Sequence, residues 1–186
     1  IRKDILKNEK VSDEAIAVYC ALCKYHTLYS RGGSFISYLS IKYLEHLLFN
    51  KTKIKGINKI LEKALNDLIE FGLIEPIEIF EDKSGVYDMT PLLSFDKKKF
   101  YVDIAIDELS TIMAVKYTKF SLLRYFLTLV GSFGATHLMD DKYKFKLSVA
   151  SIDTLARISR ISPTSVMKYN LILQNNKIIY IAKSCV

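Results

Sequence analysis

The chain has few cysteines, no secretory signal and no long uninterrupted apolar run. Three cysteines among 186 residues are an odd number, which fits a reducing compartment better than a disulfide framework. Residues 1–10 are charged and lack the apolar centre of a signal peptide. The most apolar stretch, Phe120–Met139, is interrupted by Arg124 and Gly131, so a buried helix with its exit loop explains it better than a membrane span. These absences predict a cytoplasmic protein.

Motifs for catalysis and for metal binding are also missing. The sequence contains no phosphate-binding glycine loop, no dinucleotide fingerprint and no recognisable nucleophile setting. Cys20, Cys23 and His26 have metal-like spacing, but they lie on one expected helix, and structural zinc needs four tetrahedral ligands. We therefore expect no enzymatic activity, no metal and no cofactor. A catalytic tyrosine of the kind that replication enzymes use as a nucleophile stays open as an alternative. Those enzymes usually also have a His-rich metal motif, which this sequence lacks.

One short phrase occurs twice. Ser40–Leu47 reads SIKYLEHL, and Ser151–Ile158 reads SIDTLARI. A longer amphipathic stretch precedes each copy (Ser12–Tyr29 and Tyr117–Ser132), and a second periodic stretch that ends on a hydrophobic pair follows each copy. The order of long helix, short helix, second helix and strand occurs twice. This repeat predicts two winged helix-turn-helix units in tandem. The expected fold class is mainly α with small β wings, α+β.

The expected units are residues 1–96 and residues 97–186. Half of the residues are hydrophobic, so each unit can bury its own core. Pro91–Asp107 is the expected junction. The chain ends at Val186, soon after a strand is predicted to begin, and we expect it to be a piece of a longer protein.

In the first unit we expect helices at Ser12–Tyr29 and Leu39–Phe49, with Ser12 as an N-cap. A short strand is expected at Phe35–Ser37, and a wing hairpin at Glu75–Phe80 and Val86–Met89. The third helix should bury one stripe and end near Gly72, a natural residue for the left-handed position. That stripe consists of Ile57, Leu61, Ala64, Leu65 and Leu68.

In the second unit a strand is expected at Tyr143–Val149 and a wing strand at Lys177–Ala182. Ser151 and Ser162 are expected N-caps, and Asn175-Asn176 is the expected left-handed helix end. Pro163 should occupy the first helical position after Ser162. The predicted core residues are Phe120, Leu123, Leu127, Val130, Ile152, Leu155, Val166, Tyr169 and Leu173.

Positive charge gathers in the second unit. The whole chain carries a net charge of +7, and from Lys142 to Val186 there are eight cations against one acid, Asp153. Such an excess beside a helix-turn-helix suits phosphate neutralisation, so double-stranded DNA is the expected partner. We expect base contacts from Thr164, Ser165 and Lys168, and phosphate contacts from Arg157 and Arg160. Lys177 is a further expected DNA-binding residue.

The first unit is mixed in charge. Basic residues that include Lys55 and Lys59 crowd the start of its third helix and form a second expected DNA-binding face. Its wing is acidic, which phosphate would repel, so the wing is expected to face solvent, the other unit or a protein. Opposite charges on these two regions predict self-association, at least a weak homodimer. The acids of the wing region are Asp67, Glu70, Glu75, Glu78, Glu81, Asp82 and Asp88.

The string from Ser151 to Val166 resembles the S-x-x-T-L-A-x-x-x-x-I-S-x-x-T-V register of many bacterial winged-helix proteins. With its preceding helix, the last seventy or so residues look like modules of DnaD-type replication proteins and of plasmid or phage replication initiators. The resemblance implies origin or operator binding, self-association and no cofactor. Asn170, where the core normally wants Leu, and Leu171-Ile172 near the outer face depart from a generic helix-turn-helix. The apolar pair indicates either a protein contact or tighter packing between domains.

The leading hypothesis is a DNA-binding protein of replication initiation, either an initiator or a primosomal component. A winged-helix transcriptional regulator is the first alternative. A protein-interaction scaffold built from winged helices, with replication proteins as partners, is the second. Repeated direct sites would favour an origin, and a single palindrome would favour an operator.

Overall fold

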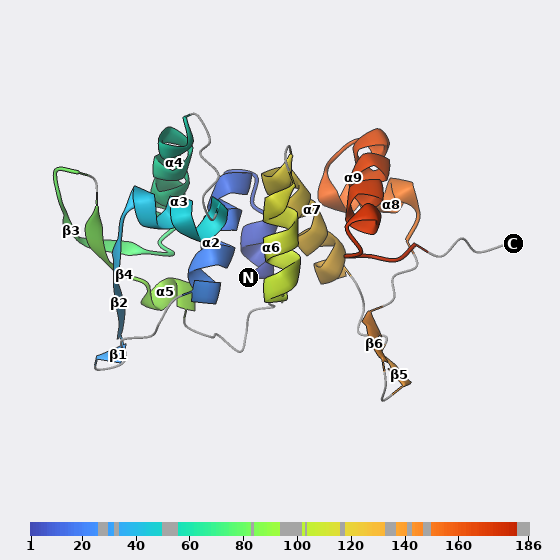
Figure 1. Cartoon of the computed structure of the whole chain (residues 1–186), viewed down its shortest axis with the longest axis horizontal. Helices are drawn as coiled ribbons and strands as arrows, with labels where there is room; N and C mark the ends of the chain where they lie inside the picture. Colours follow the sequence, from blue (N-terminus) through green and yellow to red (C-terminus); the bar gives the residue numbers. More distant parts are fainter. Residues whose placement is uncertain are drawn as a thin grey trace, which may run out of the picture. The chain divides into compact units, whose positions relative to one another are not determined.

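The computed structural model describes residues 1–25, 30–31, 34–49, 56–82, 84–93, 102, 104–115, 118–132, 137–140, 143–146 and 150–181. The chain divides into two compact units, Ile1–Tyr101 and Val102–Val186. The sequence placed this boundary after Asp96. Both units are mainly helical with antiparallel strands, so the architecture is α+β (Figure 1).

Three helices of unit 1 pack on one another around a single core. They are α2 (Asp13–Tyr25), α3 (Ile41–Phe49) and α4 (Ile57–Glu70), and each contacts the other two. The predicted stripe of α4, from Ile57 to Leu68, is buried. Burial of that stripe fixes α4 against α2 and leaves its opposite side for solvent.

Local hydrogen bonds set where α2 begins and where α4 ends. The Ser12 hydroxyl accepts a hydrogen bond from the Ala15 N–H at 3.2 Å, so the predicted N-cap is confirmed. The same hydroxyl donates to the carboxylate of Asp67 on α4, which joins the two helices. At the end of α4 the Leu73 N–H bonds to the Leu68 carbonyl at 2.9 Å, and Gly72 adopts the predicted left-handed conformation, with φ 61°.

The sheet of unit 1 has the strand order β1-β2-β4-β3, all antiparallel. Its strands are β1 (Ser30–Arg31), β2 (Ser34–Leu39), β3 (Glu75–Ile79) and β4 (Gly85–Asp88). Leu39 and Tyr87 lie on the buried face, and β3 is an exposed edge. Gly85 is required in its place, because a Cβ there would lie 2.5 Å from the Glu78 carbonyl oxygen. The hairpin predicted at Glu75–Phe80 and Val86–Met89 is present as β3 and β4.

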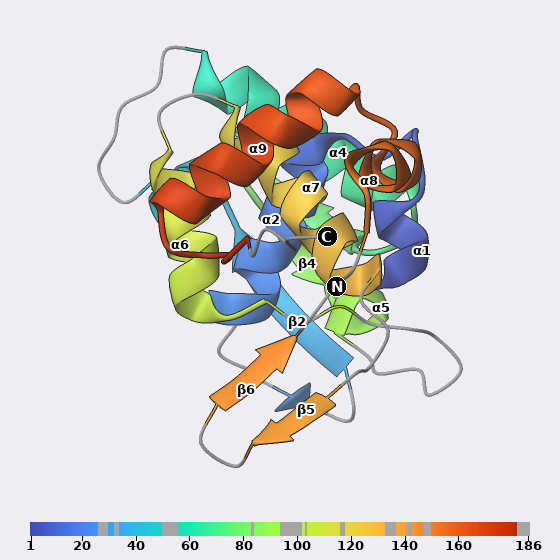
Figure 2. The same cartoon turned by 90° about the vertical axis from the view of Figure 1, so that its right-hand side faces the viewer.

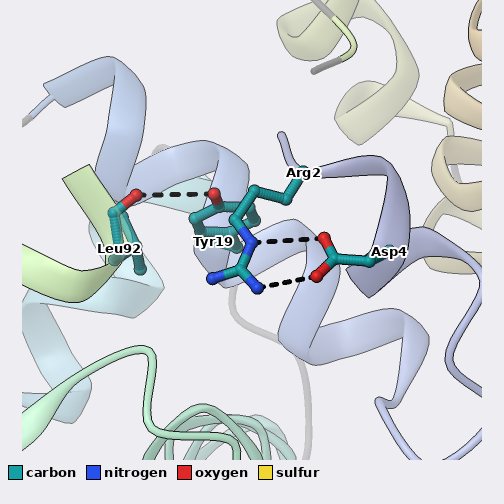
Figure 3. A network of polar contacts seen from close by, with 4 residues as sticks. All are labelled: Arg2, Asp4, Tyr19 and Leu92. Atoms are coloured by element: carbon teal, nitrogen blue, oxygen red, sulfur yellow. Dashed lines mark hydrogen bonds and ion pairs between the residues drawn. The ribbon is translucent and has the colours of Figure 1, made fainter. Parts of the chain in front are cut away.

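Helix α1 (Lys3–Leu6) buries Ile5 and Leu6, and α5 (Thr90–Leu93) follows β4; Figure 3 shows polar contacts near both helices. Arg2 donates two hydrogen bonds to Asp4, at 2.7 and 3.2 Å, and the Arg2 guanidinium holds the pKa of Asp4 below its ordinary value. The hydroxyl of the buried Tyr19 donates to the Leu92 carbonyl at 3.4 Å. Helix α5 also contacts β2, so the segment after the wing returns to the core.

Helix α7 (Lys119–Ser132) is the centre of unit 2. It contacts α6 (Ile106–Ala114) and α8 (Ile152–Ser159), and α8 in turn contacts α9 (Pro163–Asn175). Figure 2 shows α9 crossing α7, and a hydrogen bond from Tyr125 to Asn170 joins these two helices. A separate hairpin pairs β5 (His137–Asp140) with β6 (Tyr143–Lys146).

The core of unit 2 differs from the predicted one at three positions. Phe120 and Val130 are half-buried, whereas α7 buries Leu122, Tyr125, Phe126 and Leu129 together with the predicted Leu123 and Leu127. Helices α6 and α8 contact α7, and α9 is hydrogen-bonded to it, so its buried face is wider than a single stripe. Ile152 was predicted to point inward and is 40% exposed, because the side chain of a first helical residue leans past the helix end.

The end of α9 also departs from prediction. Residues 177–181 form no strand, so the wing strand predicted from Lys177 is wrong over the described part of that range. The left-handed residue is Lys177, with φ 58°, and neither Asn175 nor Asn176. The predicted strand at Tyr143–Val149 is confirmed as β6 up to Lys146, and its partner β5 was not predicted.

Candidate nucleic-acid interface

Helices α8 and α9 are held in unit 2 by N-terminal caps and by buried side chains. The Ser151 hydroxyl accepts a hydrogen bond from the Thr154 N–H at 3.1 Å and caps α8, as predicted. Leu155 of α8 is buried as predicted, and Ala156 beside it is buried too. Val166, Tyr169 and Leu173 of α9 are also buried, as predicted. The buried sides of the two helices thereby fix which sides face outward.

The turn between the two helices is held by its own backbone and by a cap. Arg160 adopts a left-handed conformation, with φ 56°, which lets the Ile161 N–H bond to the Ala156 carbonyl at 3.2 Å. The Ser162 hydroxyl accepts a hydrogen bond from the Ser165 N–H at 3.1 Å, and Pro163 occupies the first helical position. The turn therefore sets the direction in which α9 leaves α8.

Polar contacts lock α9 onto α7. The Tyr125 hydroxyl donates to Asn170 Oδ1 at 2.7 Å, and the Tyr169 hydroxyl donates to Ser121 Oγ at 3.0 Å. The two tyrosine rings lie 5.6 Å apart between centroids. Burial raises the pKa of Tyr125 to about 12, although its hydrogen bond with Asn170 opposes that rise. Asn170 is thus a partner of a tyrosine at the helix crossing, a role that the sequence did not reveal.

The predicted contact residues on this helix pair are mostly exposed. Arg157, Thr164 and Lys168 are exposed, and Thr164 and Lys168 are four residues apart on one side of α9. Arg160 lies in the turn between the helices, and Lys177 follows the end of α9; both are exposed. The end of α8, the turn, the outward side of α9 and the residue after its end therefore carry most of the predicted set at exposed positions.

Ser165 has a different place from the one expected. It is half-buried, and its hydroxyl lies 2.9 Å from the Ser162 hydroxyl, so it belongs to the cap of α9. Sequence reasoning also missed Met167, which is 51% exposed on the same side of α9 as Thr164. Its spacing of three residues from Thr164 was the available signal. Leu171, at 57% exposure, continues that side one turn further.

The second expected DNA-binding face lies on α4 of unit 1. Lys59 is exposed on this helix, and so are Asn58, Lys63 and Asn66. Lys55 lies outside the described residues. Helix α4 thus presents a polar, partly basic side opposite its buried stripe.

The acids near the wing divide into two groups. Glu70, Glu75, Glu78 and Glu81 are exposed. Three others act as local acceptors: Asp67 binds Ser12, Asp88 accepts the Thr90 N–H at 2.8 Å, and Asp82 binds Ser84. The Ser84 side chain and N–H hold the pKa of Asp82 below its ordinary value. The charge available to a partner is therefore concentrated in the four glutamates.

The outward face of the sheet in unit 1 carries apolar side chains beside these acids. Tyr38 of β2 and Phe80, after β3, have ring centroids 6.4 Å apart, and both are exposed. Ile36 is exposed and pairs in register with Asp88, on the same face as Tyr38. We call Ile36, Tyr38 and Phe80 the sheet-face cluster.

Within the part of the chain that the structure describes, no three His, Cys, Asp or Glu side chains form a group that could hold a metal ion. Cys20 is buried, and burial raises the pKa of its thiol to about 12. No helix among the described residues is both long enough and apolar enough to span a membrane. No family model, no curated protein and no solved structure matches the chain.

Proposed function

We propose that this chain is a cytoplasmic DNA-binding protein built from two winged helix-turn-helix units in tandem, acting in replication initiation. The connectivity of unit 1 supports the winged-helix part. Its elements run α2, β2, α3, α4, β3, β4, and β4 pairs between β2 and β3. A helix pair followed by a hairpin is the order that a winged helix requires.

Unit 2 repeats the helical part of that plan, although residues 177–181 after α9 form no strand. Helices α7, α8 and α9 follow one another as α2, α3 and α4 do, and a strand pair precedes α8 as β1 and β2 precede α3. The repeated phrase begins with the same cap in both copies: the Ser40 hydroxyl accepts the Tyr43 N–H at 3.1 Å, and Ser151 accepts the Thr154 N–H at 3.1 Å. Leu44 and Leu155, four residues on, are both buried.

The observation that carries the proposal is the charge on the α8–α9 surface. Residues 151–181 contain four cations, Arg157, Arg160, Lys168 and Lys177, and one acid, Asp153. All four cations are exposed, and they lie on the last turn of α8, in the turn, on α9 and directly after α9. Cations on the first helix and the turn suit phosphates, while the second helix enters the major groove.

Duplex binding tests the proposal. Binding selection from a random pool of duplexes should recover a preferred sequence, and the affinity for it should fall steeply with salt. A protein that folds and binds no duplex at low salt contradicts the proposal. The recovered sequence also separates the two DNA-binding readings: repeated direct sites support a replication origin, and a single palindrome supports a transcriptional operator.

A second candidate function is a scaffold for protein contacts, and the sheet-face cluster favours it. Its three exposed apolar side chains stand beside Glu75 and Glu78 on β3, where phosphate would be repelled. This surface is suited to a basic protein partner, which includes the α4 side of a second copy with its Lys59 and Lys63. We propose self-association through unit 1 on this basis, with unit 2 left for DNA.

A further inference from the structure

The outward side of α9 carries apolar side chains where a DNA-reading helix commonly carries hydrogen-bonding ones. Thr164, Met167 and Leu171 follow the spacing i, i+3, i+7 and lie on one side of the helix. Met167 is 51% exposed and Leu171 57% exposed, while Val166 and Leu173 are fully buried on the opposite side. The exposure of Met167 and Leu171 is therefore set by the fold of the unit.

Two amides and one hydroxyl of this region hold α9 in place, whereas Gln174, three residues after Leu171, is exposed. Asn170 accepts the hydrogen bond of Tyr125, and Ser165 pairs with Ser162. The Asn176 amide donates to the Ile172 carbonyl at 2.8 Å and caps the helix end. In the first two turns the exposed side chains are thus Pro163, Thr164, Met167 and Lys168. Arginine, asparagine and glutamine, which read guanine and adenine by paired hydrogen bonds, are absent from that exposed set.

We propose that α9 recognises thymine through its C5-methyl group, with Met167 and Leu171 as the contacting side chains. The inference rests on the proposed function, since it requires α9 to enter the major groove. There the thymine methyl is the base feature that an apolar side chain contacts, and Thr164 adds a methyl and a hydroxyl at the N-terminal end. Lys168, beside them, supplies charge for a guanine edge or a phosphate. The preferred site is therefore rich in thymine.

Replacing thymine by deoxyuridine tests the proposal, because it removes the methyl group and leaves every hydrogen-bonding group of the base. The probe is the duplex that binding selection recovers, with its thymines replaced one at a time. Each methyl that α9 covers should cost about four-fold in Kd when it is removed, the equivalent of one buried carbon. Thymines outside the contact should show no change.

Two variants assign the effect to the helix. Met167→Ala with Leu171→Ala should bind the thymine and deoxyuridine duplexes alike, at the weaker of the two affinities. Lys168→Ala is the matched control from the same side of α9. It should weaken both duplexes equally and keep the preference for thymine. All three side chains are exposed, so the thermal midpoint should stay unchanged in both variants.

Equal affinity for thymine and deoxyuridine duplexes overturns the inference and leaves the proposed function standing. A recovered site without thymine also overturns the inference. The same holds if the Met167→Ala, Leu171→Ala protein keeps the full preference for thymine over deoxyuridine. A double variant that binds DNA normally but loses self-association assigns this side of α9 to a protein partner and overturns the inference as well. If the folded wild type binds no duplex at all, both the proposed function and this inference are contradicted.

Discussion

Two of the predicted DNA contacts, Arg160 and Lys177, stand in left-handed backbone positions that favour glycine. Their φ angles are 56° and 58°; Arg160 is the C-cap residue of α8, and Lys177 directly follows Asn176, the C-cap residue of α9. A left-handed conformation costs a residue with a Cβ about 1 kcal/mol or more. Both positions thus carry a long cationic side chain where glycine would fit the backbone better. Strained backbone positions of this kind cluster at functional sites.

Arg160→Gly should therefore raise the free energy of unfolding by up to about 1 kcal/mol and weaken duplex binding. Lys177→Gly should give a similar gain in stability, which makes it the matched control for the backbone effect. Chemical denaturation and duplex titration measure the two properties. If Arg160→Gly destabilises the protein while Lys177→Gly stabilises it, the side chain of Arg160 contributes to the fold and the strain argument fails at that site.

Tyr125 gives a pH dependence at the contact between α7 and α9. Its pKa is raised to about 12 by burial, above the ordinary value near 10, so the folded state favours the neutral hydroxyl. This contribution is complete below about pH 10 and is lost as the pH rises toward 12. The wild type should therefore lose more stability over that interval than Tyr125→Phe, as denaturation at several pH values measures. Equal losses in the two proteins would contradict the burial of this hydroxyl.

At the scale of elements, periodicity predicted the helices well where one side is buried. The stripe of α4 and the inward residues of α9 were predicted from spacing alone, and so were the caps at Ser12, Ser151 and Ser162. These features depend on residues within one or two turns. The wide buried face of α7 depends on helices that approach it from two sides, and the role of Asn170 depends on Tyr125, forty-five residues away. Sequence patterns within one helix do not predict contacts with residues far away in the sequence.

The crossing of α8 and α9 gives a direct contrast between core and surface. Leu155 is buried, and Thr164, at the start of α9, is exposed. Leu155→Ala should lower the free energy of unfolding by about 2–5 kcal/mol, because it leaves a cavity. Thr164→Ala should leave stability nearly unchanged and alter the preferred duplex sequence. Thermal shifts in the reverse order would mean that the outward side of the helix pair is assigned wrongly.

The wing provides a prediction about self-association. Exchanging Glu78 and Glu81 for Lys reverses exposed charges without touching Asp82, whose hydrogen bonds to Ser84 shape the turn. The wild type should form a dimer at low salt that high salt weakens, and the reversed protein should be monomeric, as sedimentation measures. Reversal of Glu9 and Glu14, away from the sheet, is the control and should leave the dimer intact. A wild type that stays monomeric at high micromolar concentration in low salt contradicts the proposed contact.

At the scale of the whole molecule, the net charge of +7 is unevenly shared. Unit 2 holds eleven Lys and Arg against six acids, whereas unit 1 holds sixteen against fourteen. The sequence predicted this asymmetry, since charge can be counted without a structure. The structure adds where the charge lies: the cations at the end of α8, in the turn and on α9 belong to one helix pair, and all of them are exposed. This arrangement favours unit 2 as the main DNA-reading unit.

The most direct test of this account is the salt dependence of duplex binding by the wild type and by the variant Arg157→Ala, Arg160→Ala, Lys168→Ala. A variant with Lys7, Lys10 and Lys42 changed to Ala removes the same net charge from exposed positions of unit 1 and serves as the control. We predict that log affinity falls linearly with log salt, and that each lost phosphate contact in the first variant makes the slope shallower by about 0.9. The control should keep the slope of the wild type. An unchanged slope in a folded Arg157, Arg160, Lys168 variant, or the absence of salt-sensitive duplex binding by the wild type, would contradict the account.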